Sequence, residues 1–248
     1  LLKFHQDNGT SAILIMGSTG ETSMLAPEEK KKIIVETAKM KTAAMPIFYG
    51  CTGNNTDVTI ANVKFAKDNG ACAIFVRGLE YERRLTDPYF FPLYKLAEKL
   101  DLAVTLHSGN NSFQMWDIFR EEGGFNKSKL MVIGAFHSLI MDGIPEKFPN
   151  VRWGFVEVSA QWIPYVFNDI SLRLRKRGKR LPDNPMKAFN MYVACQVTDD
   201  LPAVLAVILI RLAVINTARH GVKVILAIYP PCLQTRLAMQ RSLYSHRA

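Results

Sequence analysis

Residues 11–34, SAILIMGSTGETSMLAPEEKKKII, contain the pattern that decides the fold class. The run from Ser11 to Met16 is apolar and ends at Gly17, which is typical of a strand buried in a parallel sheet. Pro27 and two glutamates then open a segment with apolar residues at helical spacing, a favourable start for a helix. A buried strand followed by a helix is the repeating unit of α/β folds.

The same alternation of short apolar runs and helix-period segments continues along the chain. We expect further strands at residues 46–49, 71–76, 102–106, 151–158, 191–196 and 222–228. Helices are expected at residues 27–40, 56–69 and 88–100 and within 113–147, where residues 130–136 fit helix or strand equally. Seven such strands predict an α/β, TIM-type (β/α) barrel that lacks its first strand, as a single domain over residues 1–248.

The composition is that of an ordinary globular protein, with 48% hydrophobic and 21% charged residues. Four scattered cysteines without a CxxC pair indicate small buried side chains in a reducing compartment. Residues 1–8 form no signal peptide, and Pro202 and Arg211 interrupt the most apolar stretch, residues 201–218. We therefore expect a cytoplasmic protein with no membrane partner.

The formal net charge of +9 is unevenly distributed. The last 48 residues contain six Lys or Arg and no Asp or Glu, which marks residues 208–248 as an atypical basic end. A further basic run at residues 173–180 favours a solvated helix end over a phosphate or RNA contact. Without a nucleic-acid-binding motif, we expect no nucleic acid partner.

Candidate binding residues follow the expected strands, because the chemistry of a (β/α) barrel lies in the loops after its strands. Ser18 and Thr19 form a glycine-flanked turn after the first of them. Such a turn can bind an anion through its N–H groups and hydroxyls, or it can simply reverse the chain. Arg77 and Asn110 follow two later strands. We expect these four residues to bind a small carboxylated substrate.

His107 and Glu157 end two neighbouring expected strands. A neutral imidazole and a carboxylate can transfer protons or hold a divalent metal such as zinc or manganese. Both residues are therefore candidate catalytic residues and candidate metal ligands. A structural pair without chemistry is an equal alternative. The chain has no HxH or HExxH spacing that would complete a zinc site.

Residues 9–76 resemble the dihydrodipicolinate synthase/N-acetylneuraminate lyase family in GTSAILIMGSTGETSML, APEEKKKII, MPIFYGCTGNNT and FAKDNGACAIFV. GSTGE at residues 17–21 is similar to the GTTGE turn of that family, which implies that Ser18 and Thr19 bind the carboxylate of a keto acid. The family also forms a Schiff base through a lysine on a later strand. Val156 stands at that lysine and His107 at its assisting tyrosine, so the imine has no nucleophile there.

Residues 70–207 resemble the amidohydrolase-2 branch of metal-dependent hydrolases and decarboxylases. The matching strings are FVRGLEYERRLTDPYFFPLYKLAEKLDLAVTLHSGN, GIPEKFPNVRWGFVEVSAQWIPYVFNDI and MYVACQVTDDLPAVL. The resemblance implies that His107 binds the metal and that Glu157 lies where relatives carry His or Glu. The family's HxH has no counterpart, and Ile228 and Pro231 replace the Asp and His of its last motif.

The chain thus divides into a synthase-like part (1–76), an amidohydrolase-like part (77–207) and the basic end (208–248). The leading hypothesis is an amidohydrolase-like hydrolase or decarboxylase with an incomplete set of metal ligands. The alternatives are a synthase-like keto-acid lyase without the Schiff-base lysine, and a non-catalytic chimeric barrel. A missing strand leaves unpaired sheet edges, so we expect a homo-oligomer or another self-associating form.

Overall fold

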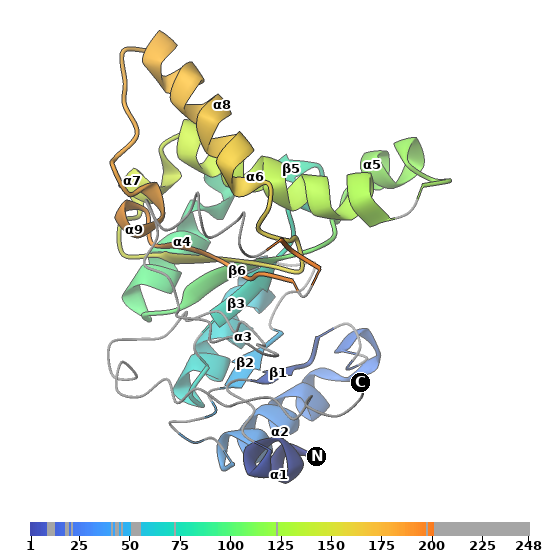
Figure 1. The fold of residues 1–248 in the computed structure, drawn as a ribbon. Helices are drawn as coiled ribbons and strands as arrows, with labels where there is room; N and C mark the ends of the chain where they lie inside the picture. The colour runs from blue at the N-terminus through green and yellow to red at the C-terminus, as the bar shows by residue number, and fades with distance from the viewer. Residues whose placement is uncertain are drawn as a thin grey trace, which may run out of the picture.

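The computed structural model describes residues 1–8, 13–17, 20, 22–40, 42, 45, 47–50, 56–71, 73–122, 124–196 and 198–200. Figure 1 shows the order of the elements along the chain. The strands are β1 (Ile13–Ile15), β2 (Ile47–Tyr49), β3 (Ala73–Val76), β4 (Leu79–Glu80), β5 (Arg83–Arg84), β6 (Ala103–His107), β7 (Arg152–Val156) and β8 (Met191–Val193). The α-helices are α1 (Leu2–Asp7), α2 (Pro27–Ala38), α3 (Thr56–Asp68), α4 (Phe91–Lys99), α5 (Phe113–Ile118), α6 (Leu130–Met141), α7 (Ile144–Lys147), α8 (Ile163–Lys176) and α9 (Pro185–Ala188).

Short helical turns join these elements. Among the described residues they include 3-10 helices at Thr22–Met24 and Pro88–Phe90 and a π-helix at Phe125–Lys129 that leads directly into α6. The N-terminus of α2 forms as the sequence predicts. Pro27 lies in its first turn, and the Glu29 carboxylate accepts a hydrogen bond from the Ala26 N–H at 2.8 Å.

The parallel sheet predicted from the sequence is present among the described residues. One sheet has the order β3-β6-β7-β8, with every neighbouring pair parallel. β1 and β2 form a second parallel pair. The α/β fold class is therefore confirmed, and residues 130–136 belong to helix α6 rather than to a strand.

The described strands do not form a closed barrel. β2 contacts β3, but no ladder of hydrogen bonds joins them within the described part of the chain. The strand expected at residues 222–228 lies outside the described residues, as does the whole basic end. A first strand missing from a closed barrel therefore stays a prediction.

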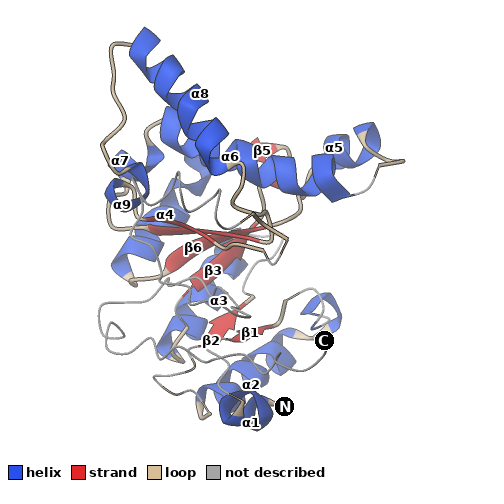
Figure 2. Cartoon of the chain, in the orientation of Figure 1, coloured by secondary structure: helices blue, strands red, loops and turns tan. Residues whose placement is uncertain are grey.

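The core cluster contains buried side chains of the four-stranded sheet and of the helices around it, and Figure 2 shows how these elements are arranged. Trp153 on β7 is fully buried and meets the Tyr94 ring of α4 edge to face at 5.0 Å between centroids. Phe136 of α6 contacts Phe155 in the same way at 5.0 Å. Offset and edge-to-face contacts of this kind add to the stabilisation from apolar burial. The core therefore fixes β6 and β7 side by side, and the candidate site lies at the ends of these two strands.

Two further expectations concern membranes and cysteines. Within residues 1–200, as far as they are described, no helix has the length and apolar character needed to cross a bilayer. The apolar stretch at residues 201–218 lies outside the described residues. Cys195 is a half-buried free thiol, whereas Cys51, Cys72 and Cys232 also lie outside them.

Candidate functional site

Three candidate residues meet at the carboxyl ends of the parallel strands. Arg77 follows β3, His107 is the last residue of β6, and Glu157 follows β7. These strands are neighbours in the order β3-β6-β7, so their carboxyl ends share one edge of the sheet. Ser18 and Thr19 lie outside the described residues, and their role in binding stays a prediction.

Both ring nitrogens of His107 have partners. Nη1 of Arg77 lies 2.6 Å from Nδ1, and Oε2 of Glu157 lies 3.1 Å from Nε2. A guanidinium can only donate hydrogen bonds, so we assign Nδ1 as the acceptor and the ring proton to Nε2, with the Ser108 carbonyl also 2.9 Å from Nδ1. In this tautomer, Nε2–H faces the carboxylate of Glu157 at ion-pair distance. The three side chains form a cation–imidazole–carboxylate line across three strands.

Arg77 is held in position by contacts with the loop after β6 and with β4. Its Nη1 also donates to the Ser108 carbonyl at 2.6 Å, and its backbone N–H donates to the Glu80 carboxylate at 2.6 Å. Gly109 has φ +124°, and a Cβ there would lie 3.5 Å from the guanidinium. The positive φ would strain any side chain at this position, whereas a Cβ would only reach ordinary van der Waals contact with Arg77.

Glu80 supports Arg77 from the β4–β5 hairpin. Burial raises the pKa of the Glu80 carboxyl, while hydrogen bonds from Asn111 and from the Arg77 backbone act in the opposite direction. The Asn111 amide donates to this carboxylate at 2.6 Å. The hairpin, whose residues are strongly polar, was not expected from the sequence.

Asn110 lies beside the site but holds its own loop together. Its side chain is buried, donates to the Lys127 carbonyl and accepts from the Ser112 N–H at 2.8 Å. These contacts connect the loop after β6 to the π-helix before α6. A role of Asn110 in binding substrate stays a prediction.

The loop after β7 has an unusual backbone. Glu157 has φ +60° and Ser159 has φ +64°, a left-handed conformation that is uncommon outside glycine. Each such residue costs on the order of 1–3 kcal/mol. Asp199, which the sequence did not single out, contacts this loop.

The described residues of this site do not by themselves complete the ligand set of a divalent metal. Within the described part of the chain, no three His, Cys, Asp or Glu side chains are grouped to hold a metal ion. His107 and Glu157 provide two donors, whereas a zinc site needs three or four. Nδ1 of the imidazole is hydrogen-bonded, Nε2 lies 3.1 Å from the Glu157 carboxylate, and the Arg77 cation lies next to the ring.

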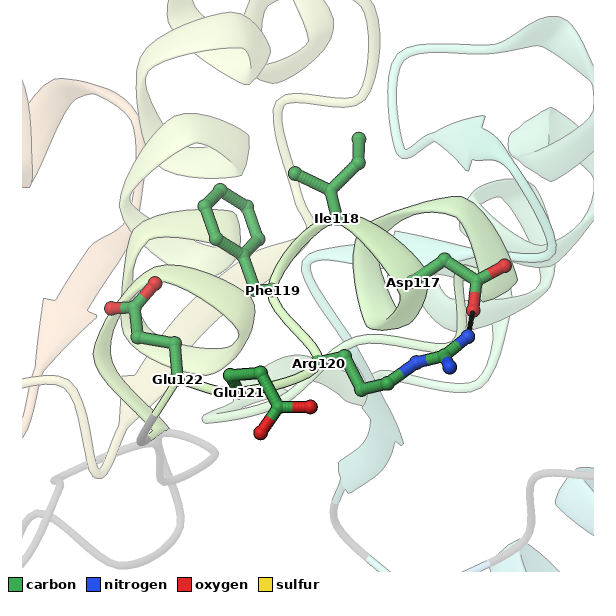
Figure 3. A pocket seen from close by; sticks show the side chains of 6 residues that line it. All are labelled: Asp117, Ile118, Phe119, Arg120, Glu121 and Glu122. Atoms are coloured by element: carbon green, nitrogen blue, oxygen red, sulfur yellow. Dashed lines mark hydrogen bonds and ion pairs between the residues drawn. The ribbon is translucent and has the colours of Figure 1, made fainter.

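A separate hollow lies at the end of α5 (Figure 3). It has a volume of about 400 Å³ and is lined by Asp117, Ile118, Phe119, Arg120, Glu121 and Glu122. The Arg120 guanidinium forms an ion pair with Asp117 at 2.8 Å. The hollow shares no residue with the line of Arg77, His107 and Glu157.

The N-terminal part of the chain is similar in sequence to one family. Residues 1–77 match the model of the dihydrodipicolinate synthetase family. A 4-hydroxy-tetrahydrodipicolinate synthase from Aquifex aeolicus is 31% identical over 109 residues, which are 44% of this chain and 37% of that protein. The enzyme of the same name from Thermotoga maritima is 27% identical over the same shares. The chain thus spans little more than a third of the length of these relatives.

Solved structures from two groups are similar in fold. A 5-carboxyvanillate decarboxylase from Sphingomonas paucimobilis has a TM-score of 0.56 at 14% identity, over 71% of this chain and 57% of that one. An amidohydrolase from Mycobacterium avium subsp. paratuberculosis has a TM-score of 0.54 at 16% identity, over 66% of this chain and 46% of that one. A dihydrodipicolinate synthase from Bacillus anthracis has a TM-score of 0.50 at 20% identity, over 83% of this chain and 58% of that one. Both resemblances inferred from the sequence are therefore confirmed: the chain is similar to dihydrodipicolinate synthases over residues 1–77, and its fold is similar to those of amidohydrolases and of the synthases.

Proposed function

We propose that this chain binds a small carboxylated molecule of the keto-acid class, on the scaffold of a dihydrodipicolinate synthase-type lyase that lacks the imine-forming lysine. The observation that carries the proposal is the family match over residues 1–77. The names of the curated relatives point the same way. Together they favour the lyase alternative over the hypothesis of an amidohydrolase-like hydrolase or decarboxylase.

Arg77 supplies the charge that such a ligand needs. Within the described residues, the hydrogen bonds of its guanidinium all come from Nη1, so Nη2 can donate to a ligand carboxylate. A guanidinium is well suited to carboxylates because its N–H groups form a planar fork. The turn of Ser18 and Thr19 would provide the second contact to the ligand.

His107 and Glu157 can act as a proton-transfer pair beside that carboxylate. The Glu157 side chain is 62% exposed, so its second oxygen can accept a proton from a bound molecule or water. Nε2 of His107, 3.1 Å from Oε2 of Glu157, can then steady the carboxylate. Val156, which stands where the resemblance places the lysine, cannot form a covalent adduct.

Titration calorimetry with pyruvate tests the proposal. Wild-type protein should bind pyruvate, and Arg77→Met should weaken binding at least about tenfold, the factor for loss of a hydrogen bond to a charged group. Arg175→Met, which removes an exposed arginine from α8, is the matched control and should bind like wild type. No binding by folded wild-type protein would refute the proposal.

Borohydride trapping tests the absence of imine chemistry. Reduction in the presence of pyruvate should leave the mass of the protein unchanged, because no lysine stands at the expected place on β7. A reduced pyruvate adduct would show that another lysine takes that role. The double variant Ser18→Ala and Thr19→Val should weaken pyruvate binding without changing the trapping result.

An amidohydrolase-type hydrolase or decarboxylase is the second candidate. It is favoured by the distance of 3.1 Å between His107 and Glu157, which end adjacent strands. The test is elemental analysis of protein purified with zinc or manganese, repeated on His107→Ala. Stoichiometric metal that is lost in the variant would establish this candidate. A protein that binds neither metal nor pyruvate would be the non-catalytic chimeric barrel.

We also propose that the chain self-associates through its unpaired strand edges. Sedimentation or light scattering over a range of concentrations tests this. A monodisperse monomer at all concentrations would refute it.

A further inference from the structure

The loop after β7 is held in a conformation that its residues do not favour. Glu157 and Ser159 both have left-handed backbone angles, and the buried Val158 lies between them. Non-glycine residues keep such angles only where the surrounding structure fixes them. The contacts that fix this loop therefore determine where Glu157 points.

The carboxylate of Asp199 provides two of these contacts. It accepts hydrogen bonds from the Ser159 hydroxyl and from the Ala160 N–H, the latter at 3.0 Å. The same carboxylate accepts the Gln196 N–H at 2.8 Å, from the segment that follows β8. Asp199 thus connects the loop after β7 to the end of the neighbouring strand. Lys129 extends the connection by donating to the Gln196 side chain at 2.8 Å.

Trp162 holds the other side of the loop. Its indole N–H lies 2.9 Å from the Val158 carbonyl and 2.8 Å from the Ser159 carbonyl. The indole satisfies the acceptors of the loop, whereas Asp199 satisfies its donors. Removal of Asp199 would leave two backbone N–H groups and a hydroxyl without their charged acceptor, and the left-handed residues would be free to relax.

The direction of Glu157 depends on this backbone. Side chains in an extended strand point alternately to opposite faces, and a left-handed residue at the strand end breaks that alternation. In its present conformation Glu157 reaches Nε2 of His107 at 3.1 Å. We propose that Asp199 is a positioning residue of the site, which aims Glu157 at His107 by holding the strained loop between β7 and α8.

This inference rests on the proposed function only for the identity of the site. It concerns the contact between Glu157 and His107, which can be measured without any ligand. Failure of pyruvate binding would count against the proposed function and would leave this inference standing.

The experiment compares Asp199→Asn with wild type by nitrogen-15 NMR of labelled histidine and by amide hydrogen exchange. Glu157→Ala, which lacks the carboxylate next to His107, is the reference variant. In Asp199→Asn, the Nε2 resonance of His107 should move most of the way to the position that it has in Glu157→Ala. The Ala160 and Gln196 amides should exchange at least about tenfold faster. Asp183→Asn, which removes an exposed carboxylate in the loop before α9, is the control and should change neither readout.

Two results would overturn the inference. If the two amides exchange faster while the His107 resonance stays in place, Asp199 holds the loop without aiming Glu157. If neither readout changes, Asp199 does not hold the loop. Should Asp199→Asn fail to fold, Ser159→Ala removes one of the three contacts and should shift the His107 resonance in the same direction by a smaller amount.

Discussion

Nη1 of Arg77 lies 2.6 Å from Nδ1 of His107, on the far side of the imidazole from Glu157. This contact decides which chemistry the ring can perform. With a cation at Nδ1, the proton is on Nε2, where a metal would have to bind. The arrangement therefore suits a carboxylate ligand at Arg77 better than a divalent cation at His107.

Replacement of Arg77 by methionine should change the tautomer of His107. In wild type, Nδ1 accepts from Arg77 and the proton resides on Nε2. In Arg77→Met, Nδ1 is free to take a proton and to donate it to the Ser108 carbonyl, which lies 2.9 Å away. Long-range proton–nitrogen NMR spectra distinguish the two tautomers. An unchanged pattern of ring shifts in the variant would contradict the assignment, and Arg175→Met controls for loss of a positive charge.

Thr105→Val should stabilise the protein by about 1 kcal/mol, because a buried hydroxyl without a partner costs free energy. Thr105 is 2% exposed on β6, and its hydroxyl has no hydrogen-bond partner in the described part of the chain. Valine has nearly the same shape and no polar atom. Urea denaturation measures the change, and Thr198→Val at an exposed position should stay within about 0.5 kcal/mol of wild type. A loss of stability in Thr105→Val would mean that the hydroxyl has a partner.

Gly78→Ala and Gly134→Ala should shift stability in opposite directions. A Cβ at Gly78 would lie 2.3 Å from the Met131 carbonyl carbon, so the start of α6 would have to move, at a cost of about 1–3 kcal/mol or more. A Cβ at Gly134 inside α6 meets nothing within 4 Å and should add about 0.5–1 kcal/mol. Thermal and urea unfolding of both variants provide the comparison. Equal effects would show that α6 does not pack on Gly78.

The sequence predicts the strands better than the helices around the site. β6, β7 and β8 begin within one residue of the starts expected from the sequence, because each consists mainly of apolar residues. α6 was ambiguous because its sequence, LMVIGAFHSLIM, is apolar beyond the buried face of Val132, Phe136 and Leu139, for example at the exposed Leu130. Such a helix shows no polar face for periodicity to detect.

The sequence likewise predicts one part of the candidate site and not the other. Arg77, His107 and Glu157 could be expected near one another, since parallel strands place their carboxyl ends at one edge. The tautomer of His107 and the role of Asp199 could not. Both depend on loop backbones with positive φ at Glu157, Ser159 and Gly109, and only the glycine is visible as such in a sequence.

The thiol of Cys195 should ionise at higher pH in the folded protein than in the unfolded chain. Burial is the main cause that raises the pKa of Cys195, and the negative charge of Asp199 adds to it. An ordinary thiol has a pKa of about 8.5, so the folded protein holds the proton more tightly. This contribution to stability is fully present below the unfolded pKa and is lost as the pH rises through the folded one.

Alkylation kinetics with iodoacetamide can measure this shift, because the thiolate is the reacting form. In the variant Cys51→Ser, Cys72→Ser, Cys232→Ser, only Cys195 reacts. Its rate should reach half its maximum at higher pH in buffer than in urea. Adding Asp199→Asn should lower that midpoint but leave it above the unfolded value, since burial remains. A folded midpoint at or below the urea value would mean that the end of β8 is open to solvent, which would contradict the packing of Asp199 and Gln196 around it.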